Sequence, residues 1–265
     1  MDRLKIGVRL ESFGLPLRRA LQEVERLGAA GVQVDAMGDL SPKALSQTGR
    51  REFRNLLRAH NVELTALGCP LRHGLDIPEN QEGRIDFIRQ VMTLGFDLGP
   101  RLVIIQPGRI PTSEDDPRLP LLQEALLTLG HYGDKTGCIL AVDMGLESGE
   151  TLSEFLNRFD TGSLAANLDP ANLLMHDFDP YASARALNRR IVHTYAKDVR
   201  SAGPSRTAQE VPIGHGDIDW MLYLGVLEEV EYRGWVTVVR ESGDNRLADI
   251  AAGVTFLRRF IGPQQ

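Results

Sequence analysis

Four apolar runs in the second half of the chain each end at or near a carboxylate. They cover residues 139–143, 164–169, 191–198 and 235–241, and each has the length and β-branched content of a buried strand. A segment with helical periodicity separates each run from the next. In a parallel (β/α) barrel the carboxyl ends of all strands open at one mouth. The pattern therefore predicts such a barrel, with acidic groups gathered where this fold carries its functional site.

Strand and helix signals alternate eight times along the whole chain. Eight βα units in about 250 residues fit a single (β/α)8 TIM barrel domain over residues 1–265. A doubly wound sheet would need a glycine-rich phosphate loop after the first strand, where the chain instead has the sequence ESFGLP. The other strands are expected at 5–10, 32–35, 62–67 and 102–106; the helices at about 15–29, 42–60, 82–98, 119–132, 151–159, 181–189, 218–231 and 247–260; and the longest irregular segment at 200–216.

Composition narrows the class of protein. The formal net charge is −6, which disfavours binding to nucleic acid through phosphate neutralisation. The two cysteines, Cys69 and Cys138, have no CxxC spacing, so neither a disulfide scaffold nor a zinc finger is expected. The chain shows no apolar signal-peptide core and no stretch long enough to cross a membrane. We expect a cytoplasmic protein with a small-molecule partner, without nucleic acid or membrane, and compatible with homo-oligomers.

Strand parity selects the side chains that point into the barrel. Side chains alternate faces along a strand, so residues two apart share a face. The four runs then send a polar group from every strand toward the mouth, and the fourth strand adds a glutamine. The predicted inward set is Gln106, Asp143, Asp169, Tyr195, Lys197 and Glu241, with His193 one layer deeper.

These residue types suit proton transfer next to a carbonyl. Such chemistry needs a base, an acid and a positive group that stabilises the enediolate between them. Asp143, Glu241 and Lys197 are the candidate catalytic residues. A divalent metal (Mn, Mg, Co or Zn) is an alternative source of positive charge, with Asp143, Asp169 and His193 as candidate ligands.

Each of these residues also has a plainer interpretation. Acidic residues just after strands cap the next helix, and a histidine in an apolar run is usually a hydrogen-bonded core residue. Loop residues near the mouth are candidate substrate contacts, although solvated positions explain them equally well. The candidate substrate-binding set is Gln106, Arg72, His73, Glu147, Tyr195 and His215.

Six segments in order along the chain carry a family resemblance: 31–35 (GVQVD), 141–148 (AVDMGLES), 167–172 (NLDPAN), 191–198 (IVHTYAKD), 211–220 (VPIGHGDIDW) and 232–241 (YRGWVTVVRE). With them the chain resembles the sugar phosphate isomerase/epimerase family, the barrels similar to xylose isomerase and tagatose epimerase. The resemblance spans essentially the whole chain. It implies a xylose isomerase-like TIM barrel that isomerises or epimerises a sugar, keto-sugar or sugar phosphate.

The resemblance also implies one divalent metal held by four strand-end residues, two of them glutamates that act as the acid/base pair. Asp143 stands at the first glutamate position and Asp169 at the aspartate position. The histidine position falls on Tyr195 and the second glutamate position on Val239, so the usual metal site is not expected to be intact.

Three functional hypotheses follow. The first is a sugar isomerase or epimerase with an altered site. The second is a family member that binds a sugar-like ligand or a partner without turnover. The third, a DNA-repair endonuclease on the same barrel, is disfavoured by the acidic charge and by the presence of only six histidines.

Overall fold

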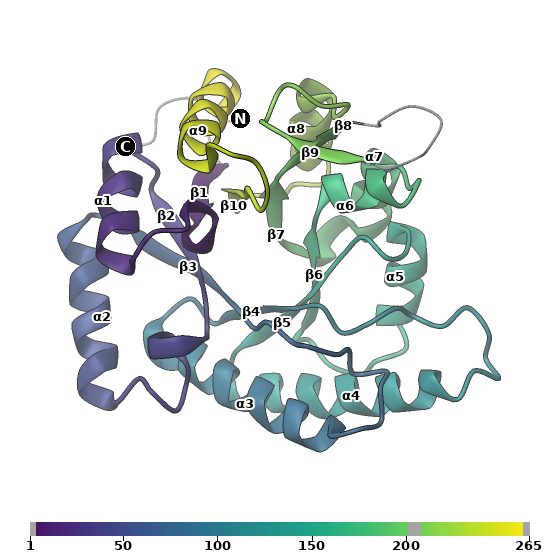
Figure 1. The fold of residues 1–265 in the computed structure, drawn as a ribbon. Coiled ribbons are helices and arrows are strands. Elements are labelled where there is room, and N and C mark those ends of the chain that lie inside the picture. Colours follow the sequence, from purple (N-terminus) through teal and green to yellow (C-terminus); the bar gives the residue numbers. More distant parts are fainter. Residues whose placement is uncertain (1–3, 201–207, 262–265) are drawn as a thin grey trace.

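The computed structural model describes residues 4–200 and 208–261, and its centre is a closed barrel of eight parallel strands. The order around the barrel is β1-β10-β7-β6-β5-β4-β3-β2, and β1 pairs with β10 from Lys5 opposite Trp235 to close it. Figure 1 shows the helices packed outside this ring. The (β/α)8 barrel prediction is thereby confirmed. Its strands are β1 (Lys5–Arg9), β2 (Gly31–Asp35), β3 (Glu63–Gly68), β4 (Leu102–Ile105), β5 (Ile139–Asp143), β6 (Leu164–Leu168), β7 (Ile191–Ala196) and β10 (Trp235–Val238).

The helices lie where the periodicity places them, with shifted ends. The helix expected from residue 42 begins only after Ser46, whose hydroxyl accepts the Gly49 N–H as an N-cap. The short helix α6 was not predicted. The described helices are α1 (Leu17–Leu27), α2 (Gln47–Ala59), α3 (Gln81–Leu98), α4 (Arg118–Thr136), α5 (Gly149–Leu156), α6 (Pro170–Met175), α7 (Pro180–Leu187), α8 (Trp220–Glu229) and α9 (Arg246–Ile261), with 3-10 turns η1 (Leu10–Phe13), η2 (Gly38–Leu40) and η3 (Asn188–Arg190). Among these helices, none has the length and apolar content needed to span a bilayer.

Two apolar layers hold the barrel together. The larger one lies between the strands and the surrounding helices. A smaller cluster consists of Ala66, Leu102, Ile104, Ala141, Tyr195 and Val239. Ala141, Tyr195 and Val239 share this cluster, as strand parity predicts for the inward face. Small residues such as Ala66 and Ala141 leave room there for the tyrosine ring.

Several strands end earlier than the sequence pattern suggests. β6 stops at Leu168, and Asp169 caps α6 by accepting the Asn172 N–H at 2.9 Å. β10 stops at Val238, so Glu241 belongs to the loop beyond it. β7 stops at Ala196, one residue before Lys197. Asp169, Lys197 and Glu241 therefore belong to the loops that follow these strands, so the alternation of strand side chains does not fix their directions.

The segment expected to be irregular contains a small hairpin. β8 (Asp198–Arg200) pairs antiparallel with β9 (Gln209–Val211), and Val199 stands opposite Glu210. Residues 201–207 of the same expected segment lie outside the described residues. The hairpin follows β7 at the carboxyl end of the barrel (Figure 1).

Candidate active site

A polar cavity of about 210 Å³ opens at the carboxyl ends of the strands. Its volume lies below the roughly 300 Å³ at which ligand pockets usually begin, which favours a small ligand. A wider hollow of about 660 Å³ lies at the opposite end, where β4, β5 and β10 begin, and this face serves stability in such barrels. The cavity at the mouth is lined by Arg9, Gln33, Asp35, Gly68, Cys69, Pro70, Leu71, Ile104, Ile105, Gln106, Asp143, Tyr195 and Glu241.

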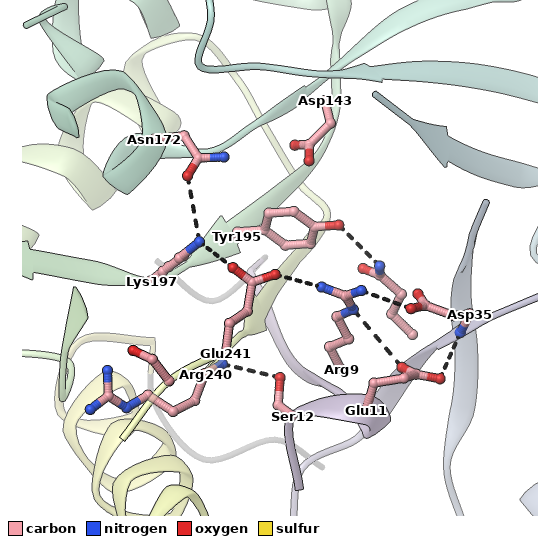
Figure 2. Close-up of polar contacts among 12 residues, drawn as sticks. Arg9, Glu11, Ser12, Asp35, Asp143, Asn172, Tyr195, Lys197, Arg240 and Glu241 are labelled. Carbon is pink, nitrogen blue, oxygen red and sulfur yellow. Dashed lines mark hydrogen bonds and ion pairs between the residues drawn. The ribbon is translucent and has the colours of Figure 1, made fainter. Parts of the chain in front are cut away.

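Arg9, the last residue of β1, connects two carboxylates across this cavity. One Nη atom lies 2.7 Å from Asp35 Oδ2 and the other 3.0 Å from Glu241 Oε1 (Figure 2). Its Nε lies 3.9 Å from Glu11 Oε2, and the other Glu11 oxygen accepts the Asp35 N–H at 2.8 Å. The fixed fork of a guanidinium suits such paired contacts. The positive charge of Arg9 is thus held at the cavity wall.

Lys197 holds the other oxygen of Glu241. Its Nζ lies 2.5 Å from Glu241 Oε2 and 3.4 Å from Asn172 Oδ1 (Figure 2). Burial alone lowers the pKa of Lys197, but Asp169 and Glu241 outweigh it and raise that pKa above its usual value. Burial likewise raises the pKa of Glu241, but Lys197 and Arg9 outweigh it and lower it. Both partners of this ion pair are therefore charged at neutral pH.

A chain of hydrogen bonds through the barrel interior ends on Asp143. Asn167 Nδ2 donates to Asp143 Oδ1 at 2.6 Å, so Asn167 Oδ1 is left to accept from His193 Nδ1, also at 2.6 Å. His193 Nε2 then accepts from Thr237 Oγ1 at 2.8 Å. This direction fixes a neutral imidazole with its proton on Nδ1. Burial lowers the pKa of His193 to about 3, which agrees with a neutral core histidine.

Asp143 is the most perturbed carboxyl group on the cavity wall. Burial, followed by the nearby charge of Asp169, raises its pKa to about 8. Asn167 and Lys197 act in the opposite direction but do not cancel the effect. The side chain retains some exposed surface, since it lines the cavity. At neutral pH Asp143 is mainly a carboxylic acid and lies within a unit or so of releasing its proton.

Tyr195 and Gln33 form the other polar wall. Gln33 Nε2 donates to the Tyr195 hydroxyl at 3.0 Å, and Gln33 Oε1 is buried with no hydrogen-bond partner within the described part of the chain. Burial raises the pKa of Tyr195 well above 10, so the phenol keeps its proton. The pair presents an O–H donor and an amide acceptor to a ligand, a combination that suits a hydroxyl or carbonyl group.

The side chains predicted to bind a metal do not assemble into a metal site. Asp143 accepts from Asn167, Asp169 caps α6, and both ring nitrogens of His193 are hydrogen-bonded. Residues 4–200 and 208–261 contain no group of three His, Cys, Asp or Glu side chains placed to hold a metal ion. The donor set found here therefore does not fit a metal in the predicted way, and metal binding itself stays a prediction.

The predicted substrate contacts are dispersed. Gln106 and Tyr195 line the cavity, whereas Arg72, His73 and His215 are exposed on loops outside its lining. Glu147 is buried in the loop after β5, away from the lining. Burial raises its pKa to about 7, and its Oε2 has no partner among the residues described.

Sequence reasoning missed the charged and amide side chains that the first two strands contribute to the cavity. Arg9, Gln33 and Asp35 lie on β1 and β2, and two of them are the last residues of their strands. For Arg9 and Asp35 the signal was the same strand-end rule that selected Asp143 in the second half of the chain, and strand alternation places Gln33 on the same face as Asp35.

The fold and the acidic mouth define an α/β barrel of the xylose isomerase type. The chain belongs to the family described as Xylose isomerase-like TIM barrel, whose sequence profile matches residues 21–260. This confirms the expected family relationship. None of the curated proteins compared with the chain matches it.

Solved structures with the same fold are distant in sequence. A Xylose isomerase domain protein from Planctomyces limnophilus is 22% identical with a TM-score of 0.87, over 99% of this chain and 100% of that one. A D-allulose 3-epimerase from Methylomonas sp. is 16% identical with a TM-score of 0.77, over 98% of each chain. A D-tagatose 3-epimerase-like protein is 17% identical with a TM-score of 0.79, over 97% of each chain. At such identities the likeness establishes the fold alone.

Proposed function

We propose that this protein isomerises a small sugar or keto-sugar by moving a proton between neighbouring carbons through an enediolate. One observation carries the proposal: a single small cavity combines the near-neutral acid Asp143 with the fixed cation Arg9. Family membership supports it, as do solved structures of the same fold described as a D-allulose 3-epimerase and an L-ribulose 3-epimerase.

Asp143 is the proton-transfer group. A catalytic acid or base works best with a pKa near the working pH, and this carboxyl group meets that condition. Its ionised form takes the proton from the carbon that bears the hydroxyl group. The resulting carboxylic acid returns the proton to the adjacent, former carbonyl carbon, while the proton of the substrate hydroxyl group moves to the former carbonyl oxygen. No oxidant is needed, because the electron pair of the broken C–H bond stays in the substrate, and the proton held by Asp143 exchanges with solvent before it returns.

Positive charge reaches the enediolate from Arg9 first and from Lys197 second. Arg9 lines the cavity and acts on the enediolate directly. Lys197 is outside the lining and acts indirectly, because it offsets the negative charge of Glu241. The Tyr195 hydroxyl adds a neutral donor. These groups are already held in place before a substrate arrives, so they stabilise developing negative charge without reorganising. The mechanism therefore does not need the predicted metal ion.

Glu241 is a weaker candidate for moving protons than the sequence suggested. Its two oxygens each contact a cation, and its pKa is lowered. A carboxylate held ionised in this way is a poor base and a poor acid at neutral pH. The proposal therefore favours isomerisation by one base on one face over epimerisation by two groups on opposite faces.

Binding without turnover is the competing function, and one observation favours it. Tyr195 and Val239 occupy barrel-interior positions where the family resemblance implies a histidine and a glutamate ligand. A barrel that has lost its ion and gained no replacement would still bind a polyhydroxylated ligand through the polar walls of the cavity.

The decisive experiment follows carbon-bound protons of ketoses and aldoses in deuterated water by NMR, with EDTA present in one series and Mn or Mg in another. We expect exchange of the α-proton of at least one sugar, retained in EDTA and abolished by Asp143→Asn. Glu52→Gln, a change on the exposed face of α2, is the control that leaves exchange intact. If no sugar exchanges but one still binds by saturation-transfer NMR, binding without turnover replaces the proposal.

A further inference from the structure

Three consecutive backbone N–H groups beyond β10 are held by side chains instead of by a neighbouring strand. The last N–H that follows the barrel pattern is that of Val239, which donates to Ala196 O at 3.0 Å. The Arg240 N–H donates to Ser12 Oγ, and the next two N–H groups donate to Glu210. The position of Glu241 therefore depends on contacts outside the barrel sheet.

Glu210, on strand β9, supplies most of these contacts. Its Oε1 accepts the Glu241 N–H at 3.0 Å, and its Oε2 accepts the Ser242 N–H at 2.8 Å and the Ser242 Oγ–H at 2.7 Å. Arg240 Nη1 lies 3.6 Å from Glu210 Oε1, and the Glu210 side chain is only 7% exposed. Hydrogen bonds from N–H groups to a buried carboxylate are among the stronger ones in proteins.

The same hairpin also continues directly from Lys197. β8 begins at Asp198, whose Oδ2 accepts the N–H groups of Gly214 and Gly216 and the indole N–H of Trp220. These bonds fasten the base of the hairpin to the loop before α8. The hairpin thus carries Lys197 at one end and, through Glu210, the backbone of Glu241 at the other.

We propose that Glu210 is a positioning residue, which sets Glu241 so that its carboxylate joins Lys197 to Arg9 across the mouth. This inference deepens the proposed function and rests on it for its catalytic meaning. Without Glu210, the N–H groups of Glu241 and Ser242 lose their acceptor and the loop moves. Glu241 then loses its contact with Lys197 or with Arg9, and that cation is no longer paired with Glu241 at the cavity wall.

The test compares Glu210→Ala and Glu210→Gln with Gln209→Ala, an exposed neighbour on β9 that serves as the control. The first readout needs no substrate: the pH titration of the Lys197 side chain by NMR in lysine-labelled protein. Both variants remove the Glu210 charge, which itself raises the Lys197 pKa, so we expect that pKa to fall in both and to stay unchanged in the control. Loss of the positioning contacts makes it fall further in Glu210→Ala than in Glu210→Gln. Thermal unfolding identifies any variant that does not fold. If Glu210→Ala does not fold, Glu210→Gln, which keeps the shape of the side chain, still tests the proposal.

The second readout is the exchange rate of the active sugar. We expect Glu210→Ala to lose about 10- to 100-fold in kcat with little change in KM, because small misplacements of catalytic groups cost this much. A folded Glu210→Ala in which Lys197 titrates as it does in Glu210→Gln overturns the positioning role, whatever the activity. Absence of exchange in the wild type overturns the proposed function instead, and the NMR titration still decides the role of Glu210.

Discussion

Lys197 Nζ lies 2.5 Å from Glu241 Oε2, although 44 residues separate the two in sequence. The lysine side chain is 8% exposed, whereas that of Glu241 is 50% exposed. A surface ion pair contributes little to stability, but a nearly buried ammonium that loses its partner carries a large desolvation cost. The contact therefore ties an exposed carboxylate at the mouth to a buried charge in the barrel.

Replacing Lys197 by Met removes that charge and frees one Glu241 oxygen. We expect the Glu241 pKa to rise toward its ordinary value, because Arg9 alone then opposes its burial. Loss of one preorganised positive group should reduce the sugar-exchange kcat by about 10²-fold. Steady-state exchange kinetics measure it, with Lys43→Met on the surface as the control. A K197M enzyme with wild-type kcat would show that Arg9 alone stabilises the enediolate.

Asp143→Asn removes the proton-transfer group without changing its size. In the wild type we expect the rate to rise with pH in proportion to the ionised fraction, up to about pH 8. The free energy of unfolding changes in the opposite direction. The Asp143 carboxyl group has a pKa near 3.9 in the unfolded chain and near 8 in the native state. Between these pH values the native state binds more protons, so it loses stability as the pH rises. Urea unfolding at pH 5 and pH 8 tests the sign, since D143N lacks this loss. Equal pH trends in both proteins would refute the assignment.

The sequence predicts the barrel well because its signals are local. Apolar run length, helical periodicity and parity act within a few residues, and they place Tyr195 and Val239 correctly in the interior. The ends of strands are set by competing local contacts instead. Asp169 leaves the strand pattern because capping α6 satisfies N–H groups that a longer strand would not.

The network at the mouth could be predicted only in part. Arg9 and Asp35 end their strands and were within reach of the strand-end rule. The hydrogen bonds from the loop at Glu241 to Glu210 could not be predicted, because no sequence periodicity connects a hairpin to a loop 31 residues away. The shifted pKa of Asp143 has the same origin, since burial and neighbouring charge are properties of the assembled barrel.

Combining Tyr195→His with Val239→Glu restores the ligand types that the family resemblance implies. Asp143 and Asp169 are already at the mouth, so we expect the double variant to bind one divalent ion, measured by metal analysis after dialysis against Mn or Zn. Val239→Glu alone should be strongly destabilised, because it buries an uncompensated carboxylate in the interior. Added metal should raise the Tm of the double variant but not that of the single one. No bound metal would mean that the remaining carboxylates are not arranged as ligands.

His193→Gln separates the core role of this residue from any role in metal binding. Glutamine can still donate to Asn167 and accept from Thr237, but it does not titrate. In the wild type the native His193 pKa is about 3 and the unfolded one about 6.5. The unfolded chain therefore binds an extra proton below pH 6.5, so His193 contributes a loss of stability as the pH decreases, of about 2 kcal/mol at pH 5, opposite in sign to the contribution of Asp143. Denaturant unfolding at pH 7 and pH 5 should therefore show that acidification stabilises H193Q relative to the wild type and to the exposed-site control His131→Gln, because only H193Q lacks the His193 loss. An H193Q protein whose stability changes with pH as that of the wild type does would mean that His193 is already protonated in the folded state.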